Sequence, residues 1–124
     1  MLRIVVAPAA EEEIRSILAW SNDNFGAAAC QRYDALLRRA MKDLAANPDR
    51  AGVCKRPELG VAVRTYHLQN SRAHVPTNVG RVQAPRHFLI FRVTDDGVLH
   101  VARVLHDSMD LNQHLPDDDD EELS

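Results

Sequence analysis

The chain has 124 residues, a length that fits one domain with a single two-layer core. Hydrophobic residues make up 45% of it, which supports a packed core and argues against global disorder. No apolar run reaches the roughly 18–20 residues of a membrane span, and residues 1–10 lack the pattern of a secretion signal. The two cysteines form no CxxC and no metal-binding spacing, which excludes a disulfide scaffold. We therefore expect a cytoplasmic protein with reduced thiols.

The net charge of −3 is unevenly distributed. Residues 117–124 carry six acids and no base, so residues 1–116 have a net charge of +3. Within residues 50–106, nine bases face three acids. A basic body suits an acidic partner, either nucleic acid or an acidic protein segment, although solvated arginines are the ordinary alternative. We expect residues 1–116 to form the domain and residues 117–124 to form a disordered acidic tail.

The first half of the chain predicts a strand and two helices. A β-branched run at residues 2–7 predicts a strand, and Pro8 suits the first turn of the helix that follows. Ile14, Ile17, Leu18 and Phe25 lie at helical spacing before a stop at Gly26. Apolar residues then recur every three or four positions from Ala29 to Leu44, and Asn47-Pro48 ends this second helix. A tight glycine turn between two helices predicts an antiparallel helical hairpin.

The second half predicts strands at residues 61–68, 86–94 and 98–106, after a loop at residues 49–60. Asp95-Asp96-Gly97 is a hairpin turn signal. Early helices and late strands favour an α+β fold with an antiparallel sheet over βαβ winding. Alternation in the last strand places its side chains on two faces, with Leu99, Val101, Arg103 and Leu105 together on one of them.

Two further segments have less definite patterns. The polar stretch at residues 69–85 is long for a connection, and we favour a mobile surface loop over a binding loop. After His106, Asp107-Ser108 are suited to cap a short helix that ends at Pro116. The apolar residues of that helix would be Met109, Leu111 and Leu115.

No motif in the sequence identifies an enzyme. The six histidines lack metal-ligand spacing, and we expect no metal and no cofactor. No glycine-rich phosphate loop and no nucleophile elbow are present. Arg64, Arg92 and Arg103 lie on three predicted strands, with His106 at the end of the last. They could form the phosphate site of a metal-free ribonuclease or pair with carboxylates such as Asp107 and Asp110; we favour a binding surface.

Several segments together resemble a known family. The hairpin segments read IRSILAWSNDNFG and RYDALLRRAMKDLAANPDRAG, and the later ones read LGVAVRTYHLQNSR, RHFLIFRV and VARVLHDSMDLNQHLP. In this order they resemble the ParE branch of the RelE/ParE toxins of bacterial type II toxin–antitoxin modules, over about residues 2–116. The resemblance implies a two-helix hairpin packed on a twisted antiparallel sheet. ParE-like toxins are neutralised by ParD-like antitoxins and are associated with inhibition of DNA gyrase, whereas RelE-like toxins cut mRNA in the ribosome.

Residue by residue, the resemblance favours the ParE branch. RelE-like ribonucleases tend to carry an arginine early in the third strand, where this chain has Phe88. They also carry a basic residue and a tyrosine after the last strand, where this chain has HDSMDLNQHL. Carboxylates at Asp107 and Asp110 would repel an RNA phosphate. We expect a non-enzymatic toxin; an mRNA interferase using His106, or a degenerate toxin retained as a co-regulator, are the alternatives.

The resemblance also implies partners and contact residues. The antitoxin would be a ribbon-helix-helix protein whose acidic C-terminal segment lays a helix on the hairpin and an extended part along a sheet edge. DNA would be contacted only indirectly, through the antitoxin. The expected antitoxin contacts are the first strand and Ile14, Ile17, Trp20, Lys55, Arg56 and Leu59. The expected contacts with the target are Arg64, Arg92, Arg103, His106 and Met109.

Overall fold

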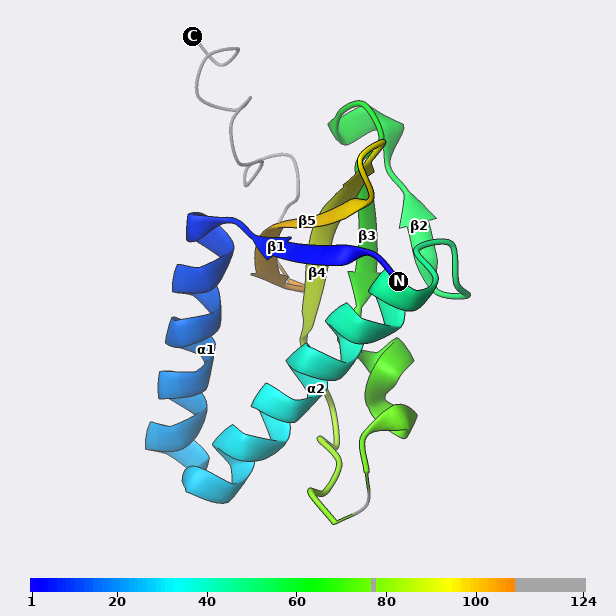
Figure 1. Ribbon diagram of the computed structural model, residues 1–124. Helices are drawn as coiled ribbons and strands as arrows, with labels where there is room; N and C mark the ends of the chain where they lie inside the picture. Colours follow the sequence, from blue (N-terminus) through cyan, green and yellow to red (C-terminus); the bar gives the residue numbers. More distant parts are fainter. Residues whose placement is uncertain (77, 109–124) are drawn as a thin grey trace, which may run out of the picture.

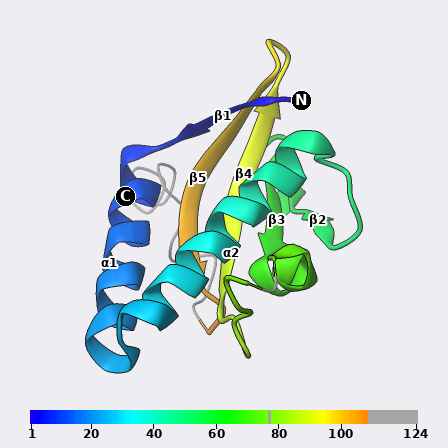
Figure 2. The ribbon, with the colours of Figure 1, turned by 60° about the horizontal axis from the view of Figure 1, so that its bottom comes forward.

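The computed structural model describes residues 1–76 and 78–108 and contains a helical hairpin on one face of a sheet (Figures 1 and 2). The strands are ordered β1-β5-β4-β3-β2. Two 3₁₀ segments, η1 (Pro57–Leu59) and η2 (Leu68–His74), flank β3. The remaining elements are β1 (Arg3–Val6), α1 (Pro8–Phe25), α2 (Ala27–Ala46), β2 (Val53–Lys55), β3 (Arg64–His67), β4 (His87–Thr94) and β5 (Val98–His106).

The α+β fold class is confirmed, with one difference in the sheet. β1 pairs with β5 in parallel, whereas β2, β3, β4 and β5 pair in antiparallel order. The sheet is therefore mixed. In the chain, the helical hairpin separates β1 from the other strands, and β1 lies as an edge strand beside β5, the last strand of the chain.

The helical hairpin agrees with its prediction. α1 begins with Pro8 in its first turn, and Gly26, at a φ of 93°, makes the tight connection to α2. The Gly26 amide donates to the Asn22 carbonyl, which satisfies a free acceptor at the end of α1. α2 ends at Ala46 before Asn47.

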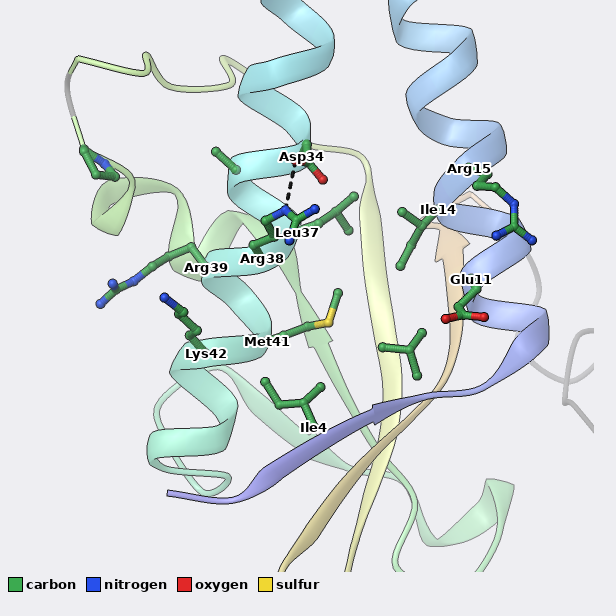
Figure 3. A pocket seen from close by; sticks show the side chains of 13 residues that line it. Ile4, Glu11, Ile14, Arg15, Asp34, Leu37, Arg38, Arg39, Met41 and Lys42 are labelled. Carbon is green, nitrogen blue, oxygen red and sulfur yellow. Dashed lines mark hydrogen bonds and ion pairs between the residues drawn. The ribbon is translucent and has the colours of Figure 1, made fainter.

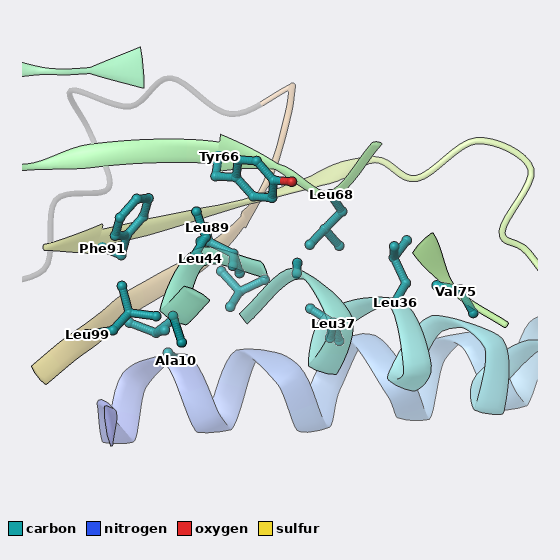
Figure 4. Packing of buried hydrophobic residues seen from close by; sticks show 14 residues of the cluster. Ala10, Leu36, Leu37, Leu44, Tyr66, Leu68, Val75, Leu89, Phe91 and Leu99 are labelled. Atoms are coloured by element: carbon teal, nitrogen blue, oxygen red, sulfur yellow. The ribbon is translucent and has the colours of Figure 1, made fainter. Parts of the chain in front are cut away.

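The main core lies between the hairpin and the sheet (Figure 4). Leu37 and Leu44 of α2 pack with Leu89, Phe91 and Leu99 of β4 and β5. Each fully buried side chain of this size contributes about 1.5–3 kcal/mol to folding. A second cluster combines Leu59 of η1 and Val63, which precedes β3, with Phe88, Ile90 and Leu105 of β4 and β5.

Two boundary predictions in the middle of the chain are wrong. The strand expected at residues 61–68 covers only Arg64–His67. Gly60 and Ala62 have φ values of 147° and 61°, so the backbone turns there instead of extending. The loop expected at residues 49–60 contains β2 and η1, because an edge strand of three residues leaves too short a pattern to detect.

A β-bulge changes the predicted facing of β5. Ile90 pairs with Arg103 and Phe91 pairs with Val101, so Ala102 is an extra residue in β5. Leu99, Val101 and Val104 accordingly belong to the main core, while Leu105 belongs to the second cluster. The prediction that Leu99, Val101, Arg103 and Leu105 share one face is therefore wrong beyond Val101.

The predicted mobile loop at residues 69–85 is also wrong in its first part. η2 packs beside α2, and Leu68, Ser71 and Val75 are buried. The helix expected at residues 109–115 and the tail expected at residues 117–124 lie outside the described residues. Within the described residues, no helix combines the length and apolar character that crossing a membrane requires.

Candidate functional site: a hairpin groove and a histidine cluster

A groove of about 760 Å³ lies between α1, α2 and β1 (Figure 3). We call it the hairpin groove. It exists because α1 and α2 diverge from the Gly26 turn and β1 crosses their open end. Its apolar lining comes from all three elements: Ile4 and Val6 of β1, Ile14 of α1, and Ala35, Leu37 and Met41 of α2.

The rim of the hairpin groove is cationic. Four bases and two acids line it: Arg15, Arg38, Arg39, Lys42, Glu11 and Asp34. Arg38 pairs with Asp34 at 2.9 Å, and Arg39 pairs with the buried Asp43 at 3.0 Å. Within residues 1–76 and 78–108, Lys42 makes no ion pair and is exposed. An apolar floor beneath a cationic rim suits an amphipathic segment that carries acidic residues.

A second polar site, the histidine cluster, lies at one end of the sheet. β3 ends at His67, β4 begins at His87 and β5 ends at His106, so the antiparallel ladder brings the three residues to the same end. The rings of His87 and His106 are 5.2 Å apart between centroids, in an edge-to-face arrangement. The other members of the histidine cluster are Tyr33, Arg86 and Asp107.

His87 is held in its neutral form. The Arg86 amide donates to the Tyr33 hydroxyl over 3.2 Å, and the hydroxyl lies 2.6 Å from Nδ1 of His87. The tautomer of His87 decides which of these two groups donates in this hydrogen bond. Burial, together with the nearby His106, lowers the pKa of His87 to about 4. Burial also raises the pKa of Tyr33.

Asp107 is fixed by two partners. Nε of Arg86 donates to both carboxylate oxygens over 3.1 and 3.2 Å, and Nε2 of His67 lies 3.1 Å from one of them. The hydrogen bonds from Arg86 and His67 lower the pKa of Asp107 to about 2. Nδ1 of His106 accepts from the Ser108 amide over 3.1 Å. The cluster therefore anchors the chain where β5 ends.

The three predicted target-binding arginines do not share one face. Arg64 stands opposite Phe91 of the main core and pairs with Asp49 at 2.9 Å. Arg103 stands opposite Ile90 of the second cluster, and its Nε donates to Glu13 over 2.7 Å. Arg92 is exposed opposite His100. His106 belongs to the histidine cluster, and Met109 lies outside the described residues.

The predicted antitoxin contacts fall on separate surfaces. Ile14 lines the hairpin groove, and Ile17 packs partly buried against the main core. Trp20 is 60% exposed near the end of α1, in edge-to-face contact with Phe25. Three other residues belong to the opposite edge of the sheet: Lys55 is exposed, Arg56 pairs with Glu58 at 2.8 Å, and Leu59 is buried in the second cluster.

Sequence reasoning missed the part of the hairpin groove that α2 provides. Leu37 and Met41 belong to the apolar stripe that predicted the helix, and Arg38, Arg39 and Lys42 follow these two residues directly. This run of bases next to the apolar residues of the helix is the sequence feature that could have indicated the α2 side of the groove. In the described part of the chain, no group of three histidine, cysteine or acidic side chains could hold a metal ion, and Cys30 and Cys54 are free thiols.

Comparison with known proteins assigns the family. The model of the "ParE toxin of type II toxin-antitoxin system, parDE" matches residues 4–111. The chain belongs to the ParE toxin family. It is 27% identical over 113 residues to Toxin ParE1 of Mycobacterium tuberculosis, in both strain CDC 1551 / Oshkosh and strain ATCC 25618 / H37Rv. The aligned region covers 91% of this chain and 97% of each relative. Membership of a ParE toxin family implies a cognate antitoxin partner.

Proposed function

We propose that this ParE-family protein is a cytoplasmic toxin that arrests growth by inhibiting DNA gyrase and is neutralised by a ParD-like antitoxin. The observation that carries the proposal is the family match over residues 4–111, which begins within β1 and extends past the end of β5. The hairpin groove supports the antitoxin part, because its floor and rim suit an acidic amphipathic segment.

The toxin acts by binding, without a chemical step of its own. Phe88, which stands where the ribonuclease branch carries an arginine, is buried in the second cluster. The Asp107 carboxylate lies within the histidine cluster and repels a phosphodiester there. Nδ1 of His67 and Nδ1 of His106 each accept a hydrogen bond from a backbone amide, and Nδ1 of His87 is hydrogen-bonded to Tyr33. The proposed gyrase contacts are Arg103 and His106 in the last part of β5, Arg92 opposite His100 nearer the start of that strand, and Met109, which follows β5 in the chain. Arg64 belongs to the other face of the sheet.

The test is to express the chain from a tightly repressed promoter and to compare two assays of the purified protein. Gyrase supercoiling should be inhibited while ribosome-programmed mRNA stays intact. Growth arrest on induction should be relieved by co-expression of the cognate ParD-like antitoxin. Normal growth without antitoxin would instead favour a degenerate toxin that acts as a co-regulator.

The histidine cluster gives the alternative function a specific basis. Its three imidazoles lie beside a tyrosine and an arginine, which are residue types that acid–base cleavage of RNA uses. If mRNA is cut and supercoiling is normal, His106→Ala in the cluster and Arg103→Ala, three residues earlier on β5, should abolish cleavage and leave antitoxin binding unchanged. That result would replace the gyrase proposal with a ribosome-dependent mRNA interferase.

A further inference from the structure

The hairpin groove is open within the described residues, and its chemistry is selective. Arg38, Arg39 and Lys42 lie on two successive turns of α2, next to the apolar Leu37 and Met41. An occupant that covers this floor and rim needs apolar side chains followed by, or interleaved with, carboxylates.

The chain itself contains a segment with that composition. Sixteen residues follow Ser108. Their first half contains Met109, Leu111 and Leu115, and residues 117–122 are four aspartates and two glutamates. Residues 1–116 have a net charge of +3, so they attract the six acids that follow them in the chain.

The segment leaves the domain within reach of the hairpin groove. The histidine cluster joins the end of β5 to α2, because the His106 ring contacts His87 and the His87 ring contacts Tyr33. Tyr33 lies nine residues before Lys42 on the same helix, a rise of about 14 Å. The nine residues from Ser108 to Asp117 can span roughly 30 Å when extended. Because this reach is about twice the rise along α2, the segment is long enough to bring its acidic residues toward the rim.

We propose that the acidic C-terminal segment, residues 109–124, docks into the hairpin groove of its own chain, pairs its carboxylates with Lys42, and shares Arg38 and Arg39 with their present partners Asp34 and Asp43. A tethered segment is present at an effective concentration of about millimolar, so docking with an intrinsic Kd below about 1 mM keeps it mostly bound. The docking itself does not depend on the proposed function. If the groove also binds the antitoxin, which rests on the proposed function, the antitoxin's acidic segment must displace this one.

The two lysines of the chain make a direct test possible, because Lys42 and Lys55 are the only ones and both are exposed. Lys42 lies on the groove rim, and Lys55 lies in β2 at the far edge of the sheet. A zero-length carbodiimide cross-linker joins an amine to a carboxylate that already touches it. In the full chain at low salt, we expect peptides of residues 117–124 to be joined to Lys42 at least about tenfold more often than to Lys55, and 0.5 M salt to suppress this preference.

A second readout uses the methionines. Of the three, Met41 lines the groove and Met1 is 90% exposed at the N-terminus. With methyl-labelled methionine, neutralising the acidic tail should shift the Met41 signal and leave the Met1 signal in place. The variant carries Asp117→Asn, Asp118→Asn, Asp119→Asn, Asp120→Asn, Glu121→Gln and Glu122→Gln.

The outcomes are separable from those of the gyrase and growth assays. Equal cross-linking to Lys42 and Lys55, or a Met41 signal that is unchanged in the neutral-tail variant, would overturn the docking. A mixture of ¹⁵N-labelled and unlabelled protein identifies the other occupant: cross-linked peptides of mixed isotope would mean a second copy fills the groove, which also contradicts docking within one chain. None of these results depends on toxicity.

Discussion

At the scale of single residues, Asp43 holds η2 against α2. Its carboxylate accepts from Ser71 over 2.6 Å and lies 2.8 Å from Nδ1 of His74. Arg50 and Arg39 pair with it at 2.8 and 3.0 Å. Burial raises its pKa, but the hydrogen bonds from Ser71 and His74 and the charges of the two arginines outweigh burial, and the net pKa is lowered.

Replacing this carboxylate should destabilise the fold strongly. Asp43→Ala leaves Arg50 and Ser71 without their shared partner beneath η2, and removing one member of a buried pair costs about 3–5 kcal/mol. Urea unfolding measures the loss. Asp49→Ala is the matched control, because that carboxylate is 67% exposed in its pair with Arg64 and should cost less than about 1 kcal/mol. Similar losses for the two variants would contradict the role assigned to Asp43.

His87 should make stability depend on pH. Its pKa is lowered to about 4 in the folded protein from about 6.5 in the unfolded chain, so below pH 6.5 the unfolded state binds a proton that the folded state does not. Stability is thus greatest above pH 6.5 and falls toward pH 4, by up to about 1.4 kcal/mol per pH unit. The depressed pKa of Asp107, about 2, acts only below pH 4.

The measurement is urea unfolding between pH 4 and pH 8. His87→Gln should flatten the profile, whereas His100→Gln, on the same two-stranded ladder, should keep the wild-type slope. A profile that His87→Gln leaves unchanged would show that the pH dependence does not come from His87.

At the scale of elements, α1 protects the edge of β5 where β1 ends. β1 pairs with β5 only as far as Val101, and the Ala7 amide makes the next bond to the Val101 carbonyl. Beyond that point, Oε1 of Glu13 accepts from the Val104 amide over 2.8 Å, and Oε2 pairs with Arg103. A side chain of α1 thus satisfies an amide that the short β1 cannot reach.

Glu13→Ala should therefore expose part of an edge. The loss of a charged hydrogen bond to the Val104 amide and of the Arg103 pair should cost about 1.5–3 kcal/mol and speed hydrogen exchange at Val104. Glu12→Ala is the control one residue earlier, where an exposed pair with Arg15 contributes little. Unchanged exchange at Val104 would show that another group protects this edge.

The elements that could be predicted from the sequence are those whose pattern involves only residues close together in the chain. The stripe from Ala29 to Leu44 and the turn at Gly26 depend only on residues close in sequence, and both were predicted. β2 was missed because three residues cannot show alternation, and the bulge at Ala102 was missed because it depends on the pairing with β4.

The partners of Asp43 could not be predicted because they come from a distant part of the chain: Ser71 and His74 are about thirty residues away. The hairpin groove likewise combines three elements, of which only the Ile14 face and the first strand were expected to bind.

At the scale of the whole molecule, the protein has two basic surfaces at opposite edges of the sheet. The hairpin groove lies beside β1, and Lys55 and Arg56 lie at β2, the strand at the other end of the sheet order. Both surfaces contain residues that the sequence predicts as antitoxin contacts. One helix of the antitoxin and the extended residues next to it can cover the hairpin groove. To reach the far edge as well, the antitoxin segment must pass across or around the sheet.

Charge reversal distinguishes these surfaces. Lys42→Glu with Arg38→Glu should weaken antitoxin binding by at least about tenfold, because like charges then face the acidic segment. Lys55→Glu with Arg56→Glu is a matched pair: each set changes the net charge by the same amount and removes one exposed ion pair, Arg38–Asp34 or Arg56–Glu58. Calorimetric titration at two salt concentrations measures both variants. If the far-edge pair weakens binding more than the groove pair, the antitoxin uses β2, and the groove is left to the acidic segment of the toxin itself.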